Sequence, residues 1–164
     1  MKKQRLISLE KQLTDIIQLI IQTPYRIVCS YYERTLQVTL INLINGKSYL
    51  IATVRGTVTP DEQSFIEYFY VMPHFHNNGI GRTLLKYYTE LQLLEGATEI
   101  HLKPLPFVPG SRDPVEYLRL VNWLGGKDYP KMSRYALVRF YESVGFKSTD
   151  PDDPGAEMQL KISA

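Results

Sequence analysis

Residues 65–85 constrain the fold more than any other stretch of this chain. The residues before Pro73 are aromatic and β-branched, which favours a strand, and Pro73 ends that strand because it cannot donate to a ladder. Gly79 and Gly81 then precede apolar residues that recur at helical spacing. Glycines let backbone N–H groups approach a ligand, and the first turn of a helix has unpaired donors and a partial positive charge. The stretch therefore predicts a strand, a loop and a helix, with room for a phosphate group where the helix begins.

Two common phosphate-binding motifs do not fit this loop. The nucleotide P-loop ends in Gly-Lys-Ser/Thr, which is missing here, and the dinucleotide fingerprint needs a third glycine where Leu84 stands. The stretch instead resembles motif A of the GNAT superfamily, the N-acetyltransferases that use acetyl-coenzyme A. In that family Val-x-Pro ends a strand and Arg/Gln-x-x-Gly-x-Gly/Ala opens a long helix; the counterparts here are residues 71–73 and 76–81. His76 departs from the first position of the second pattern.

A second GNAT signature is similar to residues 136–146. The family pattern is an alanine followed by Leu/Phe-Tyr-Glu-x-x-Gly-Phe, and the chain matches it at residues 140–142 and 145–146. Arg134 stands where the family often has an asparagine. Short glycine patterns recur by chance, but two signatures in the family's order and in the expected structural setting are specific together. The resemblance covers Phe65 to about Ser148.

The chain is expected to form an α/β (α+β) fold, with a mixed, mostly antiparallel, twisted sheet and helices on both faces, as in GNAT proteins. Helical spacing, strand-like runs and the Asn45-Gly46 turn signal define its elements. The expected helices cover residues 5–22, 80 to near 96, and 134–144, and the expected strands cover 25–32, 36–44, 49–58, 64–71, 99–103, 146–148 and 158–162. A strand–helix–strand crossover makes strand 99–103 parallel to strand 64–71.

Length and composition favour a single domain over residues 1–164, with an irregular insert at 104–133. The formal charge of +2, without a long run of one sign, argues against nucleic acid or a membrane as partner. No segment is apolar enough to span a bilayer, and charged residues between positions 10 and 15 argue against a signal peptide. Lone Cys29 and three histidines without metal-ligand spacing predict no disulfide and no metal. A cytoplasmic location is expected.

The resemblance implies acetyl-coenzyme A as co-substrate, bound by main-chain amides. The amides from Asn77 to Arg82 would hold its diphosphate, and those of Val71 and Met72 its thioester carbonyl and pantetheine arm. The full set of implied contacts is Val71, Met72, His76, Asn77, Asn78, Gly79, Ile80, Gly81, Arg82 and Thr83. His76 has two open interpretations, a weak or pH-dependent phosphate contact or a loop histidine in water. The glycines could also form a plain joint between loop and helix.

Acyl transfer from a thioester to an amine requires a proton for the departing sulfur. Tyr141 stands at the family's general-acid position, so the resemblance implies that it supplies this proton. A phenol titrates near ~10 and a thiol near ~8.5, so the donation is close to balanced. The alternative is that Tyr141 only packs in the core.

The attacking amine must be neutral, so a base is also needed. Glu67 lies four residues before Val71 and is expected to share a strand face with Phe69 and Val71. Family members often carry a glutamate there that contacts the acceptor or relays its proton through water. Glu67 could instead be a solvated or paired charge. His101, on the next strand, is either the rival base or a cross-strand polar residue.

The resemblance thus implies an N-acetyltransferase that moves an acetyl group from acetyl-coenzyme A to a primary amine by direct transfer in a ternary complex. No cysteine lies near the motifs, which argues against an acyl-enzyme. The acceptor is a small molecule or a protein, the insert is expected to lie over its site, and a homodimer is compatible with the family. Two alternatives stay open: a catalytically inactive cofactor-binding or regulatory module, and a transferase for another acyl-coenzyme A.

Overall fold

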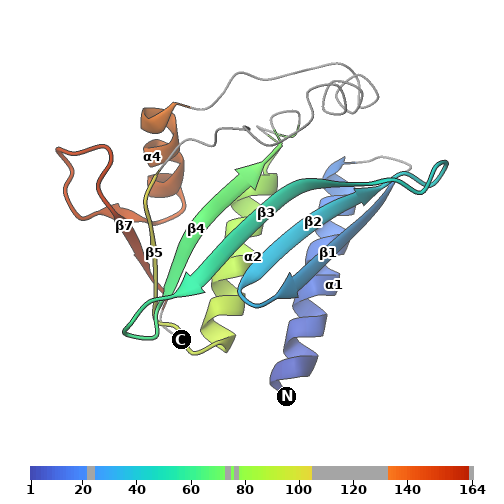
Figure 1. The fold of residues 1–164 in the computed structure, drawn as a ribbon, viewed down its shortest axis with the longest axis horizontal. Coiled ribbons are helices and arrows are strands. Elements are labelled where there is room, and N and C mark those ends of the chain that lie inside the picture. The colour runs from blue at the N-terminus through green and yellow to red at the C-terminus, as the bar shows by residue number, and fades with distance from the viewer. Residues whose placement is uncertain (22–24, 73–74, 76–77, 105–132, 163–164) are drawn as a thin grey trace.

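The computed structural model describes residues 1–21, 25–72, 75, 78–104 and 133–162. Its elements follow the order expected from the sequence (Figure 1). They are α1 (Lys2–Ile21), β1 (Arg26–Tyr32), β2 (Thr35–Ile41), β3 (Ser48–Val58), β4 (Ser64–Val71), α2 (Ile80–Leu94), β5 (Glu99–Leu102), α4 (Arg134–Ser143), β6 (Lys147–Ser148) and β7 (Met158–Lys161). The predicted insert at 104–133 lies, except for its two end residues, outside the described residues.

The strands of the described residues form one seven-stranded sheet in the order β1-β2-β3-β4-β5-β7-β6. All neighbouring strands run antiparallel except β4 and β5, which α2 connects and which run parallel. This arrangement confirms the mixed, mostly antiparallel α/β fold and the crossover between strands 64–71 and 99–103. Helices α1 and α2 lie together against one face of the sheet (Figure 1).

The core lies between these two helices and the sheet. Helix α1 contributes buried Leu9, Leu13 and Ile17, because residues four apart share one face of a helix. Helix α2 contributes a similar stripe that includes Leu84, Tyr88 and Leu91, each at most 1% exposed. Among the described residues, none of the helices combines the length and the hydropathy that a membrane span requires.

The hairpin between β2 and β3 turns earlier than the sequence predicts. The strand expected to reach Ile44 ends at Ile41. Asn42 turns the chain there, since its N–H donates to the Lys47 carbonyl at 2.9 Å and its Oδ1 accepts from the Ile44 N–H at 2.9 Å. Gly46 completes the turn with φ of 72°, a conformation that favours glycine.

Strand β4 contains a bulge at Glu67. Gly56 of β3 pairs with Ile66, and the next residue back, Arg55, pairs with Tyr68, so Glu67 is an extra residue. Before the bulge, Ser64 faces α2, as its hydroxyl donates to Gln92 of that helix at 2.9 Å.

After the bulge, the α2-facing positions of β4 are Phe69 and Val71, both of which lie against Gly81. The alternation of side chains therefore changes from even to odd numbers across Glu67. The expectation that Glu67 shares a face with Phe69 and Val71 is wrong, because the bulge leaves it exposed on the opposite face.

Candidate cofactor-binding and catalytic site

Strands β4 and β5 separate at the place where the sequence predicts the cofactor. Their parallel pairing covers three residue pairs and ends at Ile66 and Leu102. Strand β4 continues to Val71 while leaning away from β5, and α4 lies beside the wider end (Figure 1). Helix α2 begins close to that end, since Gly81 is packed against Val71.

The start of α2 presents open backbone donors. Gly79 is the N-cap residue, with φ of 87°, and a Cβ atom built there would meet nothing within 4 Å. Within the described residues, the N–H groups of Asn78, Gly79, Gly81 and Arg82 have no hydrogen-bond acceptor. These donors lie at the positive end of a helix, where an anion is stabilised.

Three of the implied amides are already engaged. The Ile80 N–H donates to Oδ1 of Asn78 at 3.3 Å, and the Thr83 N–H donates to the Gly79 carbonyl at 3.0 Å. The Met72 N–H donates to the Ile51 carbonyl at 2.8 Å, and its side chain is fully buried. The expectation that the Met72 amide binds the cofactor is therefore corrected, since pairing with β3 uses that donor. His76 and Asn77 lie outside the described residues.

An aromatic cluster joins the start of α2 to β4 and α4. The rings of Phe69 and Phe140 are stacked with centroids 6.0 Å apart, and Tyr141 lies 6.0 Å from Phe69 and 5.6 Å from Phe146. A Cβ atom on Gly81 would lie 3.4 Å from the Cζ atoms of both Phe69 and Phe140. Glycine at position 81 therefore allows the helix to begin directly against these rings.

Tyr141 is a buried residue of α4. The residue is 5% exposed, and its Oη has no hydrogen-bond partner in the described part of the chain. Burial raises the pKa of Tyr141 well above its ordinary value. The phenol therefore stays protonated at neutral pH. Proton donation from Tyr141 to a departing thiolate is less favourable than the ordinary pKa values of a phenol and a thiol suggest.

Arg82 connects the two predicted motifs, a role that sequence reasoning missed. Its guanidinium donates to the carbonyl and to the hydroxyl of Ser143, at 3.3 and 3.0 Å. Ser143 is the last residue of α4, where helix carbonyls lack intrahelical partners and attract a cation. Arg82 thus offers its amide at the start of α2 and its side chain to α4, the helix that carries Tyr141.

The two candidate bases lie on the same face of the sheet. Phe65 pairs in register with His101, so both point away from α2, as Glu67 does. His101 Nε2 lies 3.1 Å from Glu99 Oε2, and its Nδ1 lies 3.9 Å from Glu157 Oε1. Glu67 makes no hydrogen bond or ion pair with any described residue. His101 is thus held by carboxylates, whereas the exposed Glu67 remains accessible to an acceptor.

A model of the Acetyltransferase (GNAT) family matches residues 10–108. The chain belongs to this family. The match confirms the resemblance to the GNAT superfamily; it includes residues 71–81, whereas residues 136–146 lie beyond the matched range. A comparison with curated proteins gave no match.

Solved N-acetyltransferase structures resemble this chain at low sequence identity. An aminoglycoside 6'-N-acetyltransferase complexed with coenzyme A has a TM-score of 0.50 and 15% identity, covering 94% of this chain and 91% of that chain. The ribosomal-protein-S18-alanine N-acetyltransferase from Escherichia coli has a TM-score of 0.46 and 23% identity, covering 82% and 73%. The PaiA N-acetyltransferase from Thermoplasma acidophilum, in complex with coenzyme A, has a TM-score of 0.46 and 18% identity, covering 77% and 60%.

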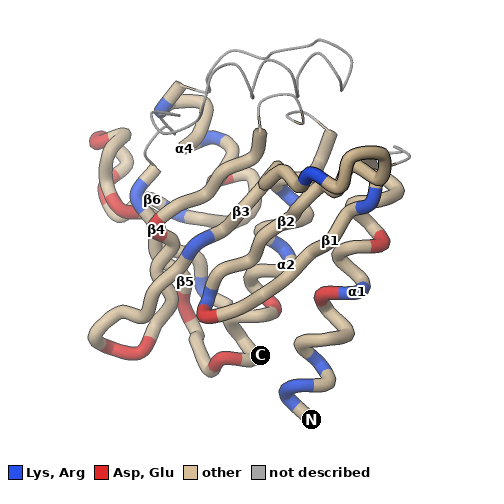
Figure 2. The backbone as a smooth tube through the Cα atoms, turned by 45° about the vertical axis from the view of Figure 1, so that its right-hand side comes forward, with Lys and Arg blue, Asp and Glu red and all other residues tan. Residues whose placement is uncertain are grey.

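Arg134 occupies the position of the usual GNAT asparagine, and its side chain lies beside Gly155. A Cβ atom on Gly155 would lie 3.5 Å from its guanidinium. Gly155 belongs to the turn between β6 and β7, where acidic residues gather (Figure 2). A positive charge is favourable beside such carboxylates.

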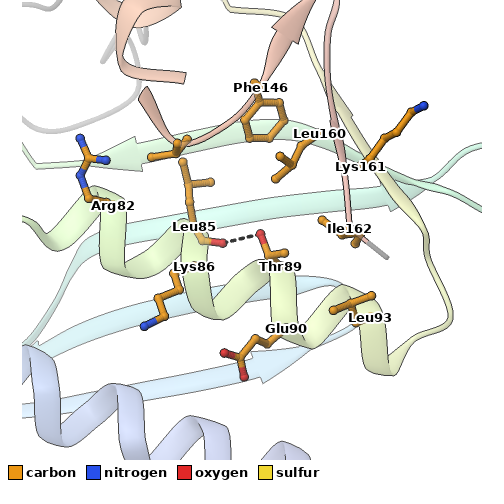
Figure 3. Close-up of a pocket in the computed structure, with 11 residues that line it drawn as sticks. Arg82, Leu85, Lys86, Thr89, Glu90, Leu93, Phe146, Leu160, Lys161 and Ile162 are labelled. Carbon is orange, nitrogen blue, oxygen red and sulfur yellow. Dashed lines mark hydrogen bonds between the residues drawn. The ribbon is translucent and has the colours of Figure 1, made fainter. Parts of the chain in front are cut away.

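A groove of about 540 Å³ lies between α2 and β7 (Figure 3). Figure 3 shows Arg82 at one end and Leu93 and Ile162 at the other, with Phe146 and Leu160 facing the helix. No metal-binding group of three or more His, Cys, Asp or Glu side chains occurs in the described residues.

Proposed function

We propose that this GNAT protein is an N-acetyltransferase that moves the acetyl group of acetyl-coenzyme A to a primary amine by direct transfer. One observation supports this most: open amides of Asn78, Gly79, Gly81 and Arg82 lie at the start of α2, next to the separating strands β4 and β5. Such donors suit a diphosphate, and the solvent-exposed Asn78 and Gly79 leave it a route of access. Acetyl-coenzyme A would supply an activated thioester there.

The proposed roles divide between the two motifs. The open amides bind the diphosphate, and Val71 at the end of β4 lies beside the pantetheine arm. Tyr141 keeps its proton because its pKa is raised, and it gives that proton from Oη to the departing sulfur. Glu67, exposed on the face away from α2, receives a proton from the attacking amine directly or through water.

Acetyl-coenzyme A should bind to the purified protein in a calorimetric titration, with one site per chain. Competition with succinyl-coenzyme A and longer acyl donors then tests the preference for acetyl. The amine is found by screening acceptors for thiol release, because an inactive cofactor-binding module would bind acetyl-coenzyme A without turnover of any amine. Absence of heat at millimolar acetyl-coenzyme A would remove the proposal.

Replacing Glu67 by glutamine should lower kcat/KM by about 10²-fold, the lower end of what a general base contributes, and should alter the acidic limb of the pH–rate profile. The substitution keeps the shape of the side chain and removes its ability to accept a proton. Asp61→Asn, at an exposed turn before β4, is the matched control and should leave the profile unchanged. An unaltered acidic limb in Glu67→Gln would exclude Glu67 as the base and make His101→Gln the next variant.

A further inference from the structure

Strand β1 forms one edge of the sheet, and the other edge is β6, which has only two residues. In an antiparallel pair, alternate residues direct their N–H groups toward the neighbouring strand and away from it. The seven residues of β1 would therefore offer unpaired N–H groups along the outer side. Such an edge is a template for pairing with a strand of another chain.

Side chains of α1 accept hydrogen bonds from these outward N–H groups. The Tyr31 N–H donates to Glu10 Oε2 at 2.9 Å, the Cys29 N–H to Thr14 Oγ1 at 3.2 Å, and the Ile27 N–H to Gln18 Oε1 at 3.0 Å. The Gln18 amide also donates through Nε2 to the Tyr25 carbonyl at 3.1 Å. Gln18 therefore accepts from Ile27 of β1 and donates to Tyr25, the residue before β1, as a backbone amide of a neighbouring strand would.

The three hydrogen bonds can form together because four residues of a helix and two residues of a strand span nearly the same distance. Glu10, Thr14 and Gln18 are four residues apart, which is about 6 Å along a helix at 1.5 Å per residue. Their partners are two residues apart in a strand, which is about 6.6 Å at 3.3 Å per residue. Each of the three polar residues directly follows a buried residue of α1, namely Leu9, Leu13 or Ile17. One side of α1 thus packs in the core while the adjacent side covers the strand edge, and Figure 1 shows the helix along β1.

We propose that α1 is an edge cap that prevents β1 from pairing with β1 of a second copy of this chain. Two antiparallel β1 strands are self-complementary under a two-fold axis, which makes a second copy the partner that this edge would accept. With β1 covered and β6 short, a native homodimer would use a surface other than the sheet edges. This inference concerns assembly and does not depend on the proposed acetyl transfer.

The test is the triple variant Glu10→Met, Thr14→Val and Gln18→Met, which removes the three acceptors while keeping side chains of similar size. Amide hydrogen exchange of Ile27, Cys29 and Tyr31 should become at least tenfold faster, whereas Val28 and Ser30, which face β2, should change less. Sedimentation over a concentration series should show a species of twice the native mass. The control variant Gln12→Met with Asp15→Met adds apolar surface on the exposed side of α1 and should match the native protein in both measurements.

Cys29 gives a second readout in the same strand. It is 6% exposed, and burial raises its pKa to about 11, so it should react slowly with a thiol reagent in the native protein and faster in the triple variant. If the triple variant does not fold, Thr14→Val alone should speed exchange at the Cys29 amide, because it removes the acceptor of that N–H. Exchange equal to that of the control, or faster exchange without any larger species in the folded triple variant, would overturn the proposal.

Discussion

Tyr141→Phe should lower kcat by about 10²-fold or more while leaving the Kd for acetyl-coenzyme A within a factor of two, because general acids contribute 10²–10⁴-fold. The variant loses only Oη, and the ring keeps its contacts with Phe69, Phe140 and Phe146. Steady-state kinetics and calorimetry measure the two quantities separately. With an acyl donor whose thiol has a low pKa, Tyr141→Phe should lower kcat less, because the sulfur of that donor needs no proton to depart.

The matched control is Tyr135→Phe, an exposed tyrosine on the same helix, which should turn over as the native protein does. The raised pKa of Tyr141 also predicts that its deprotonation does not limit the rate between pH 6 and about 10, since the acid form persists above the ordinary phenol value. Unchanged kcat in Tyr141→Phe would rule out the acid role and leave Tyr141 as a core residue.

Gly56→Ala should destabilise the fold by about 2 kcal/mol, within the range of overpacking in a close-packed core. Its Cβ would overlap Tyr88 Oη and lie 3.1 Å from the Phe65 carbonyl oxygen. The Tyr88 hydroxyl cannot move freely, because it donates to the Arg34 carbonyl at 3.0 Å and its residue is fully buried. Urea denaturation measures the change in the free energy of unfolding.

The cause can be isolated with a double-mutant cycle. In a Tyr88→Phe background the obstructing hydroxyl is gone, so Gly56→Ala should cost at least about 1 kcal/mol less than in the native background. Gly155→Ala, where the nearest atoms lie 3.5 Å from the new Cβ, should change stability by no more than about 0.5 kcal/mol. Equal costs in both backgrounds would show that Tyr88 is not the source of the strain.

Local patterns in the sequence were sufficient to predict the elements that carry the site. Three features depend only on neighbours within a few residues: the glycines at 79 and 81, the apolar spacing of α2, and the motif around Tyr141. The sequence alone was therefore enough to locate them. The crossover also followed, because a strand–helix–strand unit fixes the parallel direction of β5.

Features that depend on distant partners could not be predicted. The bulge that turns Glu67 to the other face exists because β4 pairs with β3, and pairing of Met72 with Ile51 uses an amide that the motif alone suggested was open. The Arg82–Ser143 contact spans 61 residues, and nothing in the sequence marks it. The α1 side chains along β1 share a four-residue spacing that is visible in the sequence, but only the packing of α1 against that edge gives it meaning.

We propose that the open amides at the start of α2 bind the diphosphate of acetyl-coenzyme A, and an amide NMR titration can follow each of them. Addition of acetyl-coenzyme A should shift the resonances of Asn78, Gly79, Gly81 and Arg82 in a saturable manner, with smaller changes at Ile80 and Thr83, whose N–H groups are already bonded. Unshifted resonances of these four residues at millimolar acetyl-coenzyme A would show that these amides do not bind the diphosphate.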